Sequence, residues 1–479
     1  MGGAWSRMFR KFTKNSDSSK DNSKSMAKVH DKIDDQRRNY ILALGKTINI
    51  SAVGNKTGSA NSFELIGYFR KKLESLGTKV RYISVGKNTP ILFGDLKASQ
   101  GCKRKKTLLV YGTLEAEDGS TIWRGETGGL YGSISMDSKI TFLSWIHAIG
   151  ALKEGLRDLP VNIKFILNGM GESNGSLALE EILENMKDTF FVKDIDFICI
   201  SGNDWLGKEG PCLCHGMRGN VYFELAVTCA SKDLHSGLFG GTVNEAMTDL
   251  IQLMDTLVDK EGKILIEGIY EEVEPVSSEE LESFRQMNFD VDEYKERIGV
   301  EHLTSGVDKV NTLMALVRCP SLSIHGIEGA FHENGTKTVI PRSVIGKFSI
   351  RIVPGLTADR TAELVERHLR KELSGINSGN KIHVQYKGTD PWVTSSSNPN
   401  FRAGTLATQD VYGQDPDLIQ DGECLPSVFV LDKIIGKNIM ILPMGPLDMK
   451  SQKWTEKMNI DNFIEGSKVF ASYLYHLGE

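Results

Sequence analysis

Short apolar runs and longer amphipathic stretches alternate through the first 215 residues. The runs "KVRYISV", "TLLVYG", "VNIKFILN" and "IDFICIS" have the length and composition of strands. Between them, "SFELIGYFRKKLESLG", "TFLSWIHAIGALKE" and "SLALEEILENM" have the apolar spacing of helices, and another helix is predicted from about residue 28 to 49. This alternation predicts a mostly parallel α/β sheet with helices on both faces and its sites at strand ends.

The pattern changes after Cys214. "NVYFELAVTC" alternates like a half-buried strand, and "VNEAMTDLIQLMDTLVDK" carries one apolar helical stripe. An acidic segment at 267–299 precedes two strands, the helix "DRTAELVERHLRKEL" and the strand "KIHVQY". This β-α-β-β-α-β order predicts a ferredoxin-like α+β domain. "PSVFVLD", "KNIMILPMG" and a final helix then return to the larger domain.

The two patterns together predict three parts. They are a flexible basic tail at 1–28, an α/β domain built from 29–215 and 392–479, and an inserted α+β domain at 216–391. A length of 479 residues agrees with more than one core.

Composition and charge exclude some classes of protein. A formal net charge of −5 argues against a nucleic-acid partner. The seven cysteines are scattered and odd in number, which favours free thiols in a reducing, cytoplasmic compartment. No apolar run reaches the ~20 residues of a membrane span.

The N-terminal tail leaves three interpretations open. Met1, Gly2 and Ser6 fit the pattern for N-myristoylation, which would give membrane contact through an acylated Gly2. Nearby basic residues supply the second signal that a single acyl chain needs. The absence of acidic residues before Asp17 also fits a mitochondrial presequence, and a plain flexible tail is the third interpretation.

Several stretches place polar residues at predicted strand ends. They are "YGTLEAEDG", "GSISMDSK", "NGMGESNG", "ISGNDWLG" and "MGPLDMKSQKWTEK", with "DLHSGLFGG" in the inserted domain. Singly, each has an ordinary structural interpretation. Asp137 suits a helix N-cap, Glu172 suits a turn, and His235 suits a surface position.

Taken in order, these stretches resemble one family, the cytosolic nonspecific dipeptidases and carnosinases within the clan of dinuclear zinc peptidases and aminoacylases. The matching strings include "SGNDWLGKEGPC", "DLHSGLFGGTVNEAMTDLI", "PSLSIHGIEGAF" and "KTVIPRSVIGKFSIRIVP". The resemblance spans about residue 28 to the C-terminus. It implies a zinc-peptidase-like α/β domain, an inserted lid and dimerisation domain, a homodimer, and two zinc or manganese ions.

Five residues match functional positions of that family. Asp137 falls on the bridging metal ligand, and Glu172 on a second carboxylate ligand. His235 matches a histidine that reaches the substrate across the dimer, while Thr338 and Arg351 match substrate-contacting positions of the lid. The resemblance therefore implies that the substrate-binding part is retained.

Five other residues depart from it. Thr113, Gly202 and Gln452 stand where the family has metal ligands, two of which are histidines. Gly171 stands at the position of the glutamate base, and Glu115 at that of an aspartate that orients a ligand. Because three metal donors and the base are replaced together, we expect no bound cofactor and a catalytically inactive chain.

Smaller departures lie nearby. Lys387 replaces a lid histidine, Cys424 replaces a serine of the substrate pocket, and Asp421 replaces a glutamate. Carboxylates that lack a metal repel one another, so either Lys450 or Lys139 is a candidate to place its ammonium among them. The alternative is that Lys450 is a solvated loop residue.

Three functions follow from this comparison. The first is a non-catalytic homologue that binds a small peptide or a protein partner. The second is a regulatory subunit that forms a heterodimer with an active paralogue and supplies His235 to its site. The third is an active metallodipeptidase with an atypical metal site.

Overall fold

The computed structural model describes residues 18–52, 59–84, 91–99, 104–114, 129–133, 136–156, 158–169, 171–202, 205–207, 210–445 and 455–479. The chain divides into two compact units. Unit 1 contains 1–213, 395–418 and 430–479, and unit 2 contains 214–394 and 419–429. The sequence assigns 419–429 to the α/β domain, whereas its contacts group this segment with the inserted one.

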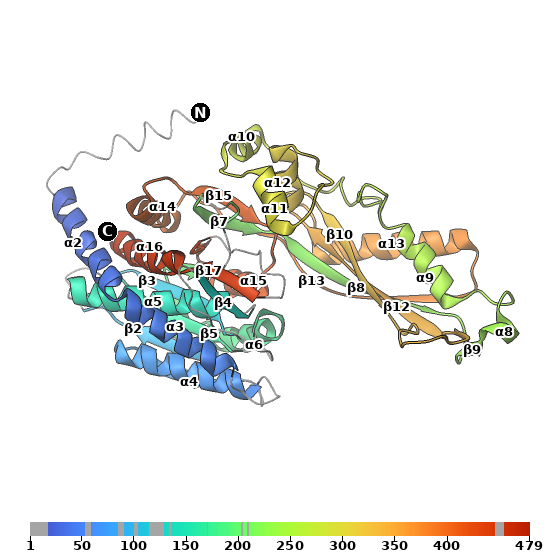
Figure 1. Cartoon of the computed structure of the whole chain (residues 1–479), viewed down its shortest axis with the longest axis horizontal. Helices are drawn as coiled ribbons and strands as arrows, with labels where there is room; N and C mark the ends of the chain where they lie inside the picture. The colour runs from blue at the N-terminus through green and yellow to red at the C-terminus, as the bar shows by residue number, and fades with distance from the viewer. Residues whose placement is uncertain are drawn as a thin grey trace. The chain divides into compact units, whose positions relative to one another are not determined.

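Unit 1 is built from helices and a mixed sheet (Figure 1). Its described helices are α2 (Ser18–Asp35), α3 (Arg37–Ala52), α4 (Ser59–Ser75), α5 (Met136–Leu156), α6 (Gly171–Met186), α7 (Phe190–Lys193), α14 (Pro399–Tyr412) and α16 (Ile460–Gly478). Its described strands are β1 (Lys79–Ile83), β2 (Ile91–Leu96), β3 (Thr107–Thr113), β4 (Gly129–Ser133), β5 (Asn162–Asn168), β6 (Phe197–Ile200), β16 (Ile439–Ile441) and β17 (Thr455–Asn459).

The sheet of unit 1 runs in the order β1-β2-β5-β3-β6-β16. β3 pairs in parallel with β5 and β6, and β16 pairs in parallel with β6. β1 and β2 are antiparallel additions at one edge. The expected α/β fold with a mostly parallel core sheet is confirmed, with an antiparallel edge that makes the sheet mixed.

One large apolar core covers a face of this sheet. Trp145 of α5 stacks on Phe470 of α16 with ring centroids 4.2 Å apart, and Phe69 of α4 meets Phe142 edge to face. α5 is apolar nearly all round because α2, α3 and α16 surround its outer side. Figure 1 shows these helices together beside the sheet.

The N-terminal prediction needs correction. The sequence predicts a flexible tail to residue 28 and one helix from 28 to 49, whereas α2 begins at Ser18 and the chain turns at Gln36 before α3. Met26 is buried in the main core. Packing of the Met26 side chain in this core outweighs the polar composition around it.

Unit 2 contains the predicted ferredoxin-like arrangement. Its helices are α8 (Ser236–Phe239), α9 (Ala246–Asp255), α10 (Ser278–Gln286), α11 (Val291–Ile298), α12 (Lys309–Val317) and α13 (Ala358–Ile376). Its strands are β8 (Gly219–Thr228), β9 (Leu234–His235), β10 (Ser321–Glu328), β11 (Val339–Ile340), β12 (Ser343–Ile352), β13 (Lys381–Thr389) and β14 (Trp392–Val393). Three elements cross the boundary between the units: β7 (Cys212–Met217), β15 (Asp417–Asp421) and α15 (Pro426–Ile435).

The four long strands of unit 2 lie in the order β10-β12-β8-β13 with antiparallel pairing throughout. α9 and α13 cover one face, where Phe223 stacks on Phe348 at 4.9 Å between ring centroids. The predicted acidic segment contains two capped helices. Ser277 accepts from the Glu280 amide at the start of α10, and Asp290 accepts from the Glu293 amide at the start of α11.

The turn after β12 generates a stability prediction. Gly355 has φ +101°, and a Cβ there would overlap the carbonyl oxygen of Glu272. Gly262 also has positive φ, +83°, but a Cβ there meets nothing within 4 Å. Thermal and urea unfolding should show a loss of about 1–2 kcal/mol for Gly262→Ala, which measures backbone strain alone. Gly355→Ala should lose about 1–3 kcal/mol more, because backbone atoms must also move apart. Equal losses for the two variants would contradict the close approach.

Candidate functional site

The carboxyl ends of the parallel strands carry the positions that the resemblance assigns to metal binding. Thr113 is the last residue of β3, is half-buried, and lies opposite Asn168, the last residue of β5. The Leu114 amide donates to the Asn168 carbonyl at 2.7 Å, which holds the two strand ends together. Gly202 lies two residues beyond β6. These strand ends share one sheet edge, where an α/β fold builds its sites.

The helices that follow these strands begin with the retained carboxylates. Asp137 is the second residue of α5 and Glu172 the second residue of α6, directly after Gly171. Glu115, Gln452 and Lys450 lie outside the described residues, and the side chains of Asp137 and Glu172 are not described either. Lys139 is described, and its side chain is almost fully buried in α5. Its predicted role among the carboxylates stays a prediction.

Few of the residues at the expected metal positions that the structure describes can donate an electron pair to a metal ion. Thr113 supplies one hydroxyl and Gly202 no side chain. Among the residues that the structure describes, no group of three or more His, Cys, Asp or Glu side chains could hold a metal ion. Counted by residue type, the five family positions offer only oxygen donors, at Asp137, Glu172, Thr113 and Gln452. That set does not fit zinc bound through imidazole, and it does fit a hard cation such as Mg²⁺ or Mn²⁺.

In unit 2, the structure brings His235 and Thr338 together. β9 pairs with β11, which sets His235 opposite Val339, next to Thr338. The Gly237 amide donates to His235 Nδ1 at 3.0 Å, so in the neutral ring the proton is on Nε2. Nε2 lies 3.2 Å from Thr338 Oγ1 and donates to it. The imidazole is exposed and held in one orientation.

Arg351 is not part of that pair. It lies near the end of β12, opposite Ser321 of β10 and Asn220 of β8. The β9–β11 pair that holds His235 lies at the other end of β12, where the Arg342 amide donates to Asp233. Arg342 and Arg351 are nine residues apart along extended chain, or roughly 30 Å. Within one chain, therefore, His235 and Arg351 do not reach a common small substrate.

Arg351 belongs instead to a charged cluster that sequence reasoning missed. Arg218 Nε donates to the Gly422 carbonyl at 3.3 Å, and its Nη1 donates to Ser321 Oγ at 3.2 Å, opposite Arg351. The Glu423 amide donates to Asp421 Oδ1 at 2.9 Å. The sequence did offer a signal for Glu423. It lies between Asp421 and Cys424, two residues that the resemblance already singles out.

The electrostatics of this cluster are unusual. Burial and the nearby Asp421 carboxylate together raise the pKa of the Glu423 carboxyl to about 7, although the Arg351 guanidinium opposes them. Burial and the nearby Arg351 charge together lower the pKa of Arg218 to about 10. Glu423 thus exchanges its proton near neutral pH, beside an arginine that the resemblance assigns to substrate.

The remaining lid positions are less informative. Lys387 is exposed on β13 opposite Tyr222, and Cys424 is half-buried. None of the six cysteines in the described part of the chain forms a disulfide. None of the described helices is long and apolar enough to span a bilayer.

Glu423 generates a pH prediction. The folded chain retains a proton at Glu423 that the unfolded chain loses between about pH 4.5 and 7. The contribution of Glu423 to stability therefore falls as pH rises through this window. Glu423→Gln is neutral at every pH, so it should match the wild type near pH 5 and be more stable at pH 8 by about 1–3 kcal/mol.

Thermal unfolding from pH 5 to 8 measures this difference. Glu301→Gln removes an exposed glutamate of the same unit and should leave the pH profile unchanged. A Glu423→Gln profile parallel to that of the wild type would contradict the raised pKa.

Comparison with known proteins gives consistent matches over nearly the whole chain. Residues 216–377 match the family model of the peptidase dimerisation domain. Beta-Ala-His dipeptidase of Homo sapiens is 38% identical over 437 residues, which cover 87% of this chain and 85% of the human protein. Cys-Gly metallodipeptidase dug1 of Schizosaccharomyces pombe is 34% identical over 474 residues, covering 95% and 98% of the two chains.

Solved structures agree with these matches. The crystal structure of human carnosine dipeptidase 1 has a TM-score of 0.81 at 36% identity and covers 95% of this chain and 99% of that one. The structure of the dipeptidase Dug1p from Saccharomyces cerevisiae has a TM-score of 0.84 at 34% identity, with the same coverage. A M20 family metallo-carboxypeptidase from Sulfolobus solfataricus has a TM-score of 0.74 at 25% identity and covers 91% and 99% of the two chains.

These relatives overturn one expectation. We expected no cofactor, but a relative 34% identical over 95% of this chain is a metallodipeptidase. That expectation rested on the missing zinc donors, whereas carboxylate and amide oxygens also bind divalent cations. With its α/β domain, its peptidase dimerisation domain and dipeptidase relatives along almost its full length, the chain belongs to the M20 family of metallopeptidases.

Proposed function

We propose that this chain is a metal-dependent dipeptidase with an atypical metal site. The observation that carries the proposal is the retained His235–Thr338 pair, with a 3.2 Å contact and a defined tautomer. An exposed imidazole fixed in one orientation is suited to holding a substrate oxygen. The relatives, which are 34–38% identical and named for dipeptide hydrolysis, support the same substrate class.

The metal would be held by oxygen donors. Asp137 and Glu172 supply the carboxylates, and Gln452 and Thr113 can add neutral oxygens. This donor set favours Mn²⁺ or Mg²⁺ over Zn²⁺. A bound divalent cation supplies Lewis-acid chemistry to peptide hydrolysis. Gly171 has no side chain to take a proton, so turnover should be slower by about 10² to 10⁴ than with a glutamate base.

A homodimer completes the proposed site. His235 and Thr338 lie roughly 30 Å along β12 from Arg351 in the same chain, too far for one dipeptide to contact both. A second copy can supply its own His235 to the site that contains Arg351. The peptidase dimerisation domain at residues 216–377 supports such an assembly.

The second candidate is a non-catalytic peptide-binding or regulatory subunit, alone or as a heterodimer with an active paralogue. The residue types at Thr113, Gly171, Gly202 and Gln452 favour it, because they remove three metal donors and the base together. Peptide recognition by Arg351 and His235 would then persist without turnover.

A metal panel separates the two candidates. The full-length chain is stripped with chelator, supplied with Mn²⁺, Mg²⁺ or Zn²⁺, and assayed for hydrolysis of Cys-Gly and β-Ala-His. We expect the fastest turnover with Mn²⁺ and a loss of at least about 10²-fold in His235→Ala, as for removal of a group that stabilises an oxyanion. His302→Ala, another exposed histidine of unit 2, is the matched control and should retain activity.

The same set of assays can contradict the proposed dipeptidase activity. If no metal supports turnover, yet Cys-Gly binds by calorimetry and Arg351→Ala abolishes that binding, the second candidate replaces the first. If the chain neither hydrolyses nor binds dipeptides, both proposals fail.

Mixed dimers test the shared site. Asp137→Ala and His235→Ala chains should each be inactive alone, because each lacks one half of every site. After subunit exchange at equal amounts, half of the dimers contain one chain of each kind, and each of these has one intact site. We expect recovery to about a quarter of wild-type activity. No recovery, despite exchange confirmed by native mass spectrometry, would contradict a site shared between copies.

A further inference from the structure

A cavity lies in unit 1, away from the strand ends that carry the proposed metal site. It has a volume of about 610 Å³, within the range of sites for small molecules. Its walls come from β1, β2, β5 and the segment around α7. Lys164 lies four residues before the carboxyl end of β5, which corresponds to roughly 13 Å of strand.

Strand register explains why charged and aromatic side chains meet here. Across the antiparallel pairs, Lys79 lies opposite Asp95, and Asp95 lies opposite Lys164. In the next row, Arg81 lies opposite Phe93. Alternate residues of a strand face the same side, so both rows are on one face of the sheet. α7 has only four residues, which leaves part of this face uncovered.

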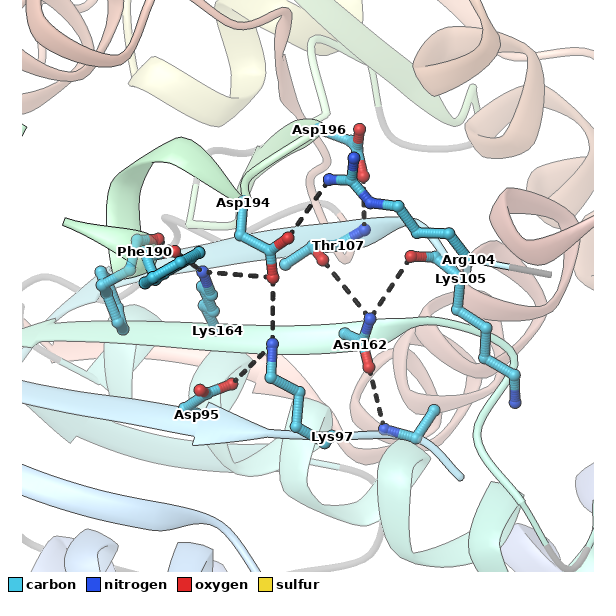
Figure 2. Close-up of polar contacts among 12 residues, drawn as sticks. Asp95, Lys97, Arg104, Lys105, Thr107, Asn162, Lys164, Phe190, Asp194 and Asp196 are labelled. Carbon is cyan, nitrogen blue, oxygen red and sulfur yellow. Dashed lines mark hydrogen bonds and ion pairs between the residues drawn. The ribbon is translucent and has the colours of Figure 1, made fainter. Parts of the chain in front are cut away.

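The acidic residues of the cavity are already neutralised. Asp194 receives Lys97 Nζ at 3.0 Å, Arg104 Nη2 at 3.2 Å and Lys164 Nζ at 3.7 Å. Lys97 also lies 3.6 Å from Asp95. Figure 2 shows these cations converging on Asp194. Lys164 is fixed further because its ammonium donates to the Phe190 and Phe191 carbonyls at 2.8 and 2.6 Å.

Arg81 and Lys79 differ from those cations. Within the described part of the chain, neither lies within 4.0 Å of a carboxylate oxygen. The Arg81 guanidinium lies 5.5 Å from the Phe191 ring centroid and 5.8 Å from that of Phe93, and its other contact is Met186 Sδ at 3.9 Å. A guanidinium held over aromatic rings keeps N–H groups for a planar or tetrahedral oxyanion.

An aromatic surface completes the site. Phe190 is 91% exposed, although it lines the cavity and its carbonyl is fixed by Lys164. A large apolar side chain exposed to this degree beside two cations has no packing role that the described residues show. It offers a ring face to an apolar group of a ligand.

We propose that this cavity binds a small organic anion that carries both an aromatic ring and a phosphate or carboxylate group. Arg81 and Lys79 bind the oxyanion, and Phe190 and Phe191 contact the ring. The site does not depend on whether the chain hydrolyses dipeptides, because none of its residues belongs to the metal positions or to the His235 and Arg351 sites.

Binding of 1-naphthyl phosphate and 1-naphthoate to the full-length chain tests the proposal by isothermal titration calorimetry. Each carries both chemical features, whereas 1-naphthol lacks the anion and inorganic phosphate lacks the ring. We expect at least one of the two combined ligands to bind about tenfold or more tightly than both single-feature compounds. The tighter of the two identifies the oxyanion, and its affinity should fall with added salt.

Variants locate the site. Arg81→Gln should weaken binding about tenfold or more, and Arg81→Lys should weaken it less. Phe190→Ser changes an exposed side chain, so it should fold like the wild type and bind about threefold more weakly. Arg70→Gln is the matched control, because Arg70 also lies over an aromatic ring, Tyr82 at 5.2 Å, but does not line the cavity.

The proposal is overturned if neither combined ligand binds more tightly than its separate parts. It is also overturned if Phe190→Ser binds like the wild type, or if Arg70→Gln loses as much affinity as the Arg81 variants. If Arg81→Gln fails to fold, Arg81→Lys and Phe190→Ser decide the outcome.

Discussion

The continuous antiparallel pairing of β8 with β12 determines what unit 2 can do. Ten residue pairs run from Ser343–Thr228 at one end to Ile352–Gly219 at the other. A paired strand cannot shorten, so His235 in the β9–β11 pair and Arg351 stay about one strand length apart. Two groups that we propose to serve one small substrate are thus separated by the geometry of a single chain. Because of this separation, the proposed reaction needs a dimer, in which His235 of one copy reaches the Arg351 site of the other.

Strand pairing also decides where sites can form in unit 1. The parallel strands β3, β5 and β6 bring their carboxyl ends to one edge, where Thr113 and Asn168 lie side by side. The antiparallel strands β1 and β2 extend the same sheet sideways and place Arg81 of β1 and Asp95 of β2 beside the middle of β5, where Asp95 lies opposite Lys164. A mixed sheet can therefore hold two chemically different sites, one at its strand ends and one on an incompletely covered face.

Much of this fold could be predicted from the sequence because its signals are local. Apolar runs gave the parallel strands, and the β-α-β-β-α-β order gave the ferredoxin-like sheet. The capped helices α10 and α11 were missed although the signal was present, since Ser277 and Asp290 each precede a glutamate by three residues. The start of α2 had no such signal, because only tertiary packing shows that Met26 is buried.

The candidate sites were harder to predict for a related reason. The Arg351 cluster draws on Arg218 and Glu423, which are about two hundred residues apart in sequence and meet only through tertiary packing. The cavity beside α7 depends on the register of β1 against β2, because that register sets Arg81 over Phe93. A residue such as Phe190 looks like an ordinary core position until its 91% exposure is known.

The two halves of the proposed peptidase site make different chemical demands. In the proposed site, peptide binding depends on a fixed oxygen-binding group and a cation, and we assign these roles to His235 and Arg351. Metal binding depends on how many donors surround one point and on their softness, so each replacement there changes which ion fits. An oxygen-only set that includes Asp137 and Glu172 can still attract a hard cation where a histidine-dependent zinc site could not form. In the proposed site, the carboxylates of Asp137 and Glu172 therefore decide which metal ion fits.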